Sequence, residues 1–236
     1  MSGSRPARTE SPWGYVGAGL LLFTALGLDF LSLFVGKALD GRALSDPAVW
    51  STHWYATVGT FLSSTALWAI TVALFAGWAR RRSALPALFS LGRDRRVFVA
   101  CGLGVVALAA LSLIGSSGPG GASLSVVREY HGFVRRYDGH GGIVTAFQYL
   151  YYLLESAVVL AMIAVFQRAG ELWWRRAWVP WGGLGLMLTW GLVHFLSHPE
   201  GAAFVVVTAL VFGLVFVAAR KSVVPLLVTL WLAFVL

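Results

Sequence analysis

The sequence predicts an all-α protein, a bundle of about seven transmembrane helices. The chain of 236 residues is 58% hydrophobic and only 12% charged. A typical soluble domain is about 45–50% apolar and about 25% charged. The apolar residues form long stretches, and the basic residues gather in the short segments between them. The excess of apolar surface therefore predicts the lipid bilayer as the main partner of this chain.

Apolar stretches long enough to span a membrane recur along the chain, because a spanning helix needs about 20 mostly apolar residues. The fifth and sixth stretches are short, and the seventh is only a partial span. The predicted spans are Trp13–Val35, Tyr55–Trp78, Val97–Ile114, Val144–Phe166, Val179–Phe195, Ala202–Ala219 and Val223–Leu236.

Basic residues are unequally shared between the two predicted sides of the membrane. Thirteen Lys and Arg residues lie in the N-terminal segment and in the loops on its side, and five lie on the other side. The side with the excess is normally the cytoplasm. We therefore expect a multi-pass protein of the cell membrane with a cytoplasmic N-terminus, and no nucleic-acid partner despite the net charge of +8.

The chain predicts one transmembrane domain over residues 13–236, preceded by a disordered cytoplasmic N-terminus over residues 1–12. The longest connection is an outer loop over residues 115–142. It begins with a Gly-rich stretch and continues with Val126–Val134, which could form a short helix at the membrane interface. The only cysteine, Cys101, lies within an apolar span and excludes an intrachain disulfide.

Glu155 is the acidic residue best placed for function, since ionisable groups inside a membrane are costly and usually face the bundle interior. Tyr152, Tyr151 and Gln148 precede it by three, four and seven residues, so these side chains share one helical face. The stripe is expected to face protein or a water-filled cavity. It could serve a reaction, or it could form a hydrogen-bond network that holds helices together.

Three other residues could contribute to an intramembrane site. Asp29 lies within the first span, and its functional and structural interpretations are equally supported. His194 and His198 are spaced by four residues, a spacing that lets two imidazoles share a metal ion. A Zn²⁺ site needs three or four ligands, so Glu155 would have to join the histidines. The alternative is an interfacial histidine pair without a metal.

The C-terminal part, over residues 149–236, resembles the CAAX-protease and bacteriocin-processing (CPBP, or Abi-like) family of intramembrane proteases. The resemblance rests on Leu153–Ala157 around Glu155, on Trp190–His194, and on Phe212–Pro225, which leads into the last helix. The chain departs from the family pattern at Val159, where an arginine is expected, and at Thr229, where a histidine is expected. The resemblance thus implies a divergent or degenerate protease with a CPBP-like C-terminal half.

Two classes of function follow. In the first, the chain is a membrane-embedded peptidase that acts on a peptide or protein, with Glu155 and His194 as catalytic residues and Gln148 and Tyr151 supporting them. Zinc would then be held by His194 and His198. In the second, the chain is a non-catalytic scaffold, partner or small transporter subunit with a polar cavity around Glu155. A metal or haem protein that uses the two histidines is a third, weaker alternative.

Overall fold

The computed structural model describes residues 10–39, 53–92, 94–115, 124–192, 194 and 202–236. Within these ranges the chain is helical, with no strand beyond a single isolated bridge between Ser90 and Ser222. The elements are α1 (Pro12–Gly27), α2 (Phe30–Leu39), α3 (Trp54–Arg81), α4 (Leu85–Leu88), α5 (Arg95–Gly115), α6 (Ser125–Tyr137), η2 (Asp138–His140), α7 (Gly141–Trp174), α8 (Trp181–Leu186), the π-helical η3 (Met187–Gly191), α10 (Ala202–Ala218) and α11 (Val223–Val235).

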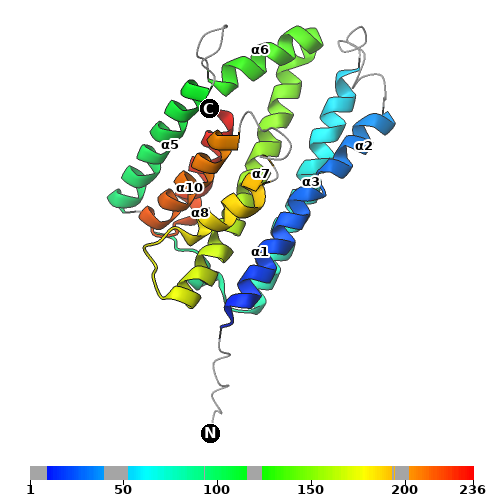
Figure 1. The fold of residues 1–236 in the computed structure, drawn as a ribbon. Helices are drawn as coiled ribbons and strands as arrows, with labels where there is room; N and C mark the ends of the chain where they lie inside the picture. Colours follow the sequence, from blue (N-terminus) through cyan, green and yellow to red (C-terminus); the bar gives the residue numbers. More distant parts are fainter. Residues whose placement is uncertain (1–9, 40–52, 93, 116–123, 193, 195–201) are drawn as a thin grey trace.

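The long helix α7 forms the centre of the bundle and packs against α1, α3, α6, α8 and α11 (Figure 1). Every residue from Val158 to Val165 is buried. A helix that is apolar around its whole circumference is stable only when neighbours cover it on all sides. The sequence of this segment therefore places α7 in the core.

Three helices of the described chain are long and apolar enough to cross a membrane. They are α3, α5 over Arg95–Ile114, and the continuous helical stretch Ser125–Trp174 that contains α7. The apolar helices over Pro12–Gly27, Phe204–Ala218 and Val223–Val235 are shorter. Large apolar side chains such as Leu74 and Leu103 are exposed on the outer surface of the bundle, as expected for helices that face lipid.

The first predicted span is not one helix. Within Trp13–Val35, the α-helical pattern stops after Gly27 and resumes at Phe30. Around the break, the backbone N–H groups of Asp29, Leu31 and Ser32 bond to carbonyls three residues earlier, which is the pattern of a tight 3₁₀ turn. Asp29 therefore lies at a helix break rather than in a continuous helix.

The fifth predicted span also differs from a regular helix. Its described part begins as α8 and widens into η3, where the hydrogen bonds span five residues. Such π-helical turns are rare and occur frequently at functional sites. Trp190, whose ring lies against that of His194, is part of this π-helical turn.

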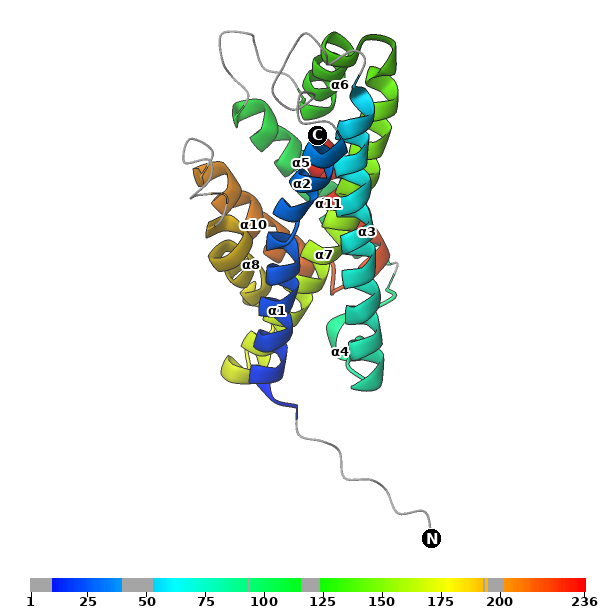
Figure 2. The same cartoon turned by 90° about the vertical axis from the view of Figure 1, so that its right-hand side faces the viewer.

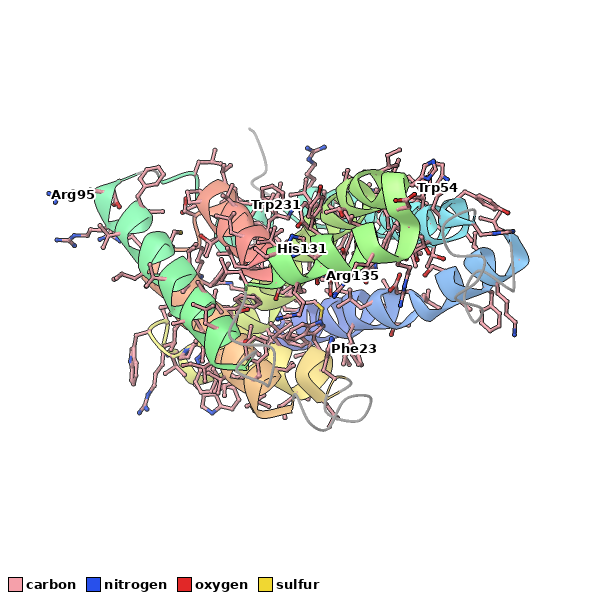
Figure 3. The ribbon with its side chains drawn as sticks, turned by 90° about the horizontal axis from the view of Figure 1, so that it is seen from above. Phe23, Trp54, Arg95, His131, Arg135 and Trp231 are labelled. Atoms are coloured by element: carbon pink, nitrogen blue, oxygen red, sulfur yellow. The ribbon has the colours of Figure 1, made fainter. Side chains whose placement is uncertain are left out.

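The predicted outer loop over residues 115–142 contains regular structure. Residues 116–123 lie outside the described ranges, but Val126–Val134 is part of the helix α6. Figure 3 shows α6, with His131 and Arg135, crossing one end of the bundle. The half-buried Val126, Glu129 and Phe133 lie on its inner face. At its C-terminal end, Tyr137 and Thr57 of α3 share a hydrogen bond of 2.7 Å between their hydroxyls.

Two glycines allow α8 and α10 to cross at close range. A β-carbon placed on Gly213 would lie 2.5 Å from the α-carbon and the nitrogen of Gly183. One placed on Gly183 would lie 2.8 Å from the carbonyl oxygen of Ala209. Helices in membranes commonly associate through such small residues, because the backbones gain van der Waals contact when they approach.

The end of the bundle opposite α6, the basic end, carries many arginines. It includes Arg80, Arg81 and Arg82 at the end of α3, Arg95 and Arg96 at the start of α5, and Arg220 and Lys221 between α10 and α11. In Figure 3 the side chain of Arg95 points away from the bundle.

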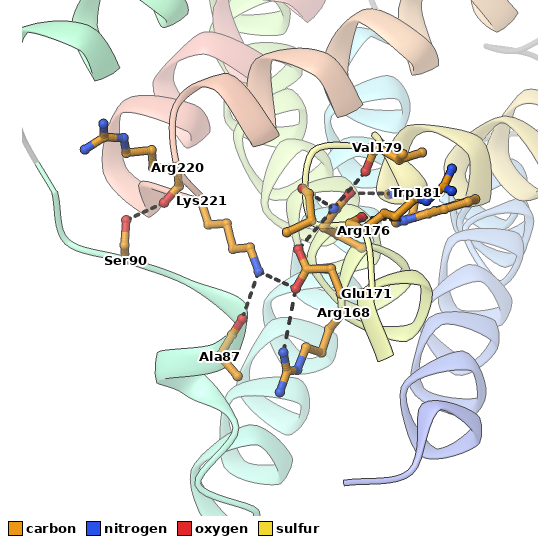
Figure 4. A network of polar contacts seen from close by, with 12 residues as sticks. Ala87, Ser90, Arg168, Glu171, Arg176, Val179, Trp181, Arg220 and Lys221 are labelled. Carbon is orange, nitrogen blue, oxygen red and sulfur yellow. Dashed lines mark hydrogen bonds and ion pairs between the residues drawn. The ribbon is translucent and has the colours of Figure 1, made fainter. Parts of the chain in front are cut away.

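A polar network ties the helices together at this basic end (Figure 4). Lys221 donates from Nζ to Oε2 of Glu171, 2.7 Å away, and to the carbonyl oxygen of Ala87, 3.4 Å away. The fully buried Gln167 accepts the backbone N–H of Gly182 and donates to the carbonyl oxygens of Ala177 and Val179. The network thereby fixes the loop between α7 and α8 and the turn between α10 and α11.

Candidate functional site

The polar stripe of α7 faces other helices in the half of the bundle next to α6. Gln148 and Glu155 are each only 8% exposed, and Tyr151 and Tyr152 are half-buried. Their spacing of three and four residues places them on one side of α7. The neighbours of the stripe are the break between α1 and α2, the helices α3 and α6, and the π-helical turn η3.

Asp29 meets this stripe from the break between α1 and α2. The hydroxyl of Tyr151 donates to Oδ2 of Asp29 at 3.3 Å, and that of Ser32 donates to Oδ1 at 3.4 Å. Tyr151 precedes Glu155 by four residues on the same face of α7, so Asp29 meets the stripe about one helical turn before Glu155.

Glu155 is buried without a basic partner among the described residues. The closest polar neighbour from η3 is the indole of Trp190, whose N–H adjoins the Glu155 carboxyl group without the geometry of a hydrogen bond. A carboxylate that is taken out of water and left unpaired is costly. Glu155 is therefore a feature that packing alone does not explain.

A second acid, Glu129, joins the stripe from α6. The hydroxyl of Tyr152 donates to Oε1 of Glu129 at 2.9 Å, and Nε2 of Gln148 donates to the hydroxyl of Tyr152 at 2.7 Å. Sequence reasoning assigned no role to Glu129. The available signal was its spacing from Val126 and Phe133, which places the three residues on one face of the predicted helix.

Several polar atoms around the stripe are enclosed and have no hydrogen-bond partner within the described ranges. Those closest to the stripe are Oε1 of Gln148, Oε2 of Glu129, and the indole N–H groups of Trp68 and Trp190. Trp68 is counted as a neighbour of the stripe because its ring lies against that of Tyr151, with the two ring centroids 4.4 Å apart. Buried polar groups normally have a partner, so this concentration of unsatisfied donors and acceptors needs an explanation. It is what a site shaped for a polar ligand or for water would present.

His194 connects to the same region through Trp190. Their ring centroids lie 4.4 Å apart, and Nδ1 of His194 lies 2.9 Å from the carbonyl oxygen of Trp190. Because a carbonyl oxygen only accepts, Nδ1 carries the proton and Nε2 is the acceptor in the neutral ring. Trp190 thus adjoins both Glu155 and His194, the two residues expected to act in catalysis.

The described residues do not form the metal site considered from the sequence. No group of three His, Cys, Asp or Glu side chains in this part of the chain could hold a metal ion. His198, the second predicted zinc ligand, lies outside the described residues. Zinc binding by His194 and His198 therefore stays a prediction.

Val159 and Thr229, the two positions that lack the residue implied by the resemblance, are buried packing positions. Val159 is fully buried in the core of α7. Thr229 is 2% exposed, and its hydroxyl donates to the carbonyl oxygen of Pro225 in the same helix at 2.9 Å. Neither residue supplies the charged or titratable group that the family pattern has at its position.

Comparison with protein-family models, curated proteins and solved structures finds no match to this chain.

Proposed function

We propose that this chain is a divergent CPBP-like peptidase of the cell membrane, with about seven spans, a cytoplasmic N-terminus and Glu155 as its catalytic base. The observation that carries the proposal is the carboxyl group of Glu155, which is buried in the bundle and has no basic partner among the described residues. Ionisable residues inside membrane bundles are functional by default, because their cost is otherwise removed by substitution.

In the proposed mechanism, the Glu155 carboxylate accepts a proton from a water molecule. The water oxygen attacks the carbonyl carbon of the substrate peptide bond, and the proton then passes to the leaving amine as the C–N bond breaks. In its protonated form, in which Nε2 also carries a hydrogen, His194 stabilises the negative charge that develops on the carbonyl oxygen. Tyr151 and Gln148 support the site by holding Asp29 and Tyr152 beside the stripe.

A non-catalytic function is the second candidate, and the position of Asp29 favours it. Membrane transporters place acidic residues and broken helices at their binding sites, where freed backbone groups line a cavity. Asp29 lies at such a break and accepts a hydrogen bond from Tyr151, which shares one face of α7 with Glu155. In this alternative the two acids bind a proton or cation, and the chain serves as a scaffold, partner or small transporter subunit.

The deciding experiment compares cells that express the wild-type chain with cells that express Glu155→Gln. New peptide N-termini in membrane proteins are labelled chemically and identified by mass spectrometry, and each candidate substrate is then tested with purified enzyme in liposomes. The peptidase proposal expects cleavage by the wild-type chain and a loss of at least 100-fold in the variant, at equal expression and melting temperature. Asp94→Asn, which changes an exposed acid at the basic end, is the matched control and should cleave normally.

Two results would overturn the peptidase proposal. One is an identical set of new N-termini with the wild-type chain and with Glu155→Gln. The other is the absence of any new terminus with the wild-type chain. Proton uptake by liposomes containing the wild-type chain but not the variant would then support the non-catalytic alternative.

A further inference from the structure

A cavity of about 680 Å³ lies between α3, α4, α7 and α11, away from the polar stripe. Its wall includes Val72 and Phe75 of α3, Leu160 of α7 and Leu227 of α11. Figure 2 shows α4 beside the lower end of α3, and Leu85 and Pro86 of α4 line the cavity. The cavity is partly open, and its volume is in the range of pockets that bind small molecules, about 300–1,000 Å³.

Small side chains create the hollow. Ala76 on α3 and Ala157 and Ala161 on α7 line the cavity where larger residues would fill it. The cavity therefore extends inward as far as α7, where residues 158–165 are all buried. An occupant would be held between helices rather than on the outer surface of the bundle.

The cavity has an apolar wall and a basic edge. All lining residues are apolar except Arg80 and Ser90. The hydroxyl of Ser90 already donates a hydrogen bond within the protein, to the carbonyl oxygen of Arg220 at 2.7 Å. Arg80 is exposed in the last turn of α3 and pairs with no carboxylate among the described residues. This arrangement suits a molecule with an apolar body and an anionic end.

The basic residues around Arg80 favour an anionic molecule as the occupant of the cavity. Arg81 and Arg82 follow it directly, at the same end of the bundle as Arg95 and Arg96. Basic residues near a membrane surface attract anionic lipids, and basic pockets between transmembrane helices bind lipid head groups. A cavity that lies between apolar helices and ends at such a surface is continuous with one leaflet of the bilayer.

We propose that this cavity binds an anionic phospholipid, with an acyl chain between α3, α7 and α11 and the phosphate group at Arg80. Oxygen atoms of the phosphate accept hydrogen bonds from the guanidinium group, which is well matched to phosphate. The apolar wall excludes water from the chain, so burial of its methylene groups contributes most of the affinity.

Native mass spectrometry of the purified full chain tests this proposal. The protein is reconstituted in nanodiscs of phosphatidylcholine with 20 mol% phosphatidylglycerol, then released in the spectrometer, and the bound lipids are counted. We expect one retained phosphatidylglycerol on the wild-type chain. Arg80→Gln should reduce this retention at least fivefold. Arg81→Gln removes the same charge from the next residue, which does not line the cavity, and should reduce the retention less than Arg80→Gln does.

Two filling variants test the cavity itself. Ala157→Phe, or Ala76→Phe if the first variant does not fold, should lower the retention of phosphatidylglycerol without changing the charge. Equal retention in Arg80→Gln and Arg81→Gln would overturn the proposal, as would no retention by the wild-type chain. A dimer of the chain that is lost on filling the cavity would also overturn it, because a second copy would then be the occupant. None of these outcomes depends on whether Glu155 is catalytic.

Discussion

The hydroxyl of Tyr151 in α7 donates a hydrogen bond to Oδ2 of Asp29, 3.3 Å away at the break between α1 and α2. The two residues are 122 positions apart in the sequence. This bond links the broken first segment to the central helix at the level of the polar stripe. It therefore holds Asp29 beside the part of α7 that carries Glu155.

Removing this bond should cost little stability but should be measurable as a coupling. Tyr151→Phe is expected to lower the free energy of unfolding by about 1 kcal/mol, the usual net value of one hydrogen bond. In a double-mutant cycle with Asp29→Asn, the coupling should be of similar size. Tyr149→Phe is the matched control, because the hydroxyl of Tyr149 is buried and has no partner in the described part of the chain. A greater loss in the control would contradict this account of the stripe.

The ion pair between Lys221 and Glu171 should be important for stability. The side chain of Glu171 is 8% exposed and that of Lys221 is 25% exposed. Breaking such a pair on one side leaves a poorly solvated charge, so Glu171→Gln should cost about 3 kcal/mol, at the lower end for a buried pair. Denaturant unfolding in detergent micelles measures this loss.

The exposed pair between Arg220 and Asp94 provides the comparison for that measurement. Its side chains are 59% and 48% exposed, so Asp94→Asn should cost between about 0 and 1 kcal/mol. Equal losses for Glu171→Gln and Asp94→Asn would show that burial of the Glu171 pair does not matter.

Gly213→Ala should separate α8 from α10. The added β-carbon would meet the backbone of Gly183 at 2.5 Å, and backbone atoms cannot move aside as a flexible side chain can. Overpacking of this kind typically costs about 1–3 kcal/mol. Gly77→Ala in α3 has no atom within 4 Å of the new β-carbon and should be neutral or slightly stabilising. Melting temperatures of the two variants in one detergent check the contrast.

The proposed orientation predicts which positions an external reagent reaches. On a Cys101→Ala background, cysteine is introduced either at Gly139, beside α6, or at Arg81, at the basic end. A maleimide that cannot cross membranes should label Gly139→Cys in intact cells, and Arg81→Cys only after permeabilisation. Labelling of Arg81→Cys alone in intact cells would reverse the orientation, and labelling of both would contradict a bundle that separates these two ends.

The helical fold and the inward face of α7 could be predicted because both depend on local patterns. A run of apolar residues sets the length of α7, and a spacing of three and four residues places Gln148, Tyr151 and Glu155 on one side. The break at Asp29 was less predictable, since no proline marks it. The only local signals are Gly27 and an acidic residue within an apolar run.

The remaining parts of the site depend on how distant segments pack. Glu129 reaches the stripe only because α6 folds across the end of the bundle, and the predicted loop gave it no position relative to α7. The position of Trp190 between Glu155 and His194 depends on the π-helical turn, whose extra residue no apolar pattern reveals. Such relationships arise from tertiary contacts and not from helical spacing.

In the turn between α10 and α11, the backbone conformation and the ion pair of Lys221 favour different residue types. Lys221 and its neighbour Arg220 both have positive φ angles, of 62° and 51°. For such residues a left-handed backbone costs about 1–2 kcal/mol, a cost that glycine avoids. Yet glycine at position 221 would remove the ammonium group that reaches Glu171. Glycine at position 221 would therefore relieve the backbone strain but would lose the ion pair with Glu171. No substitution by glycine can improve the local backbone without losing this long-range contact.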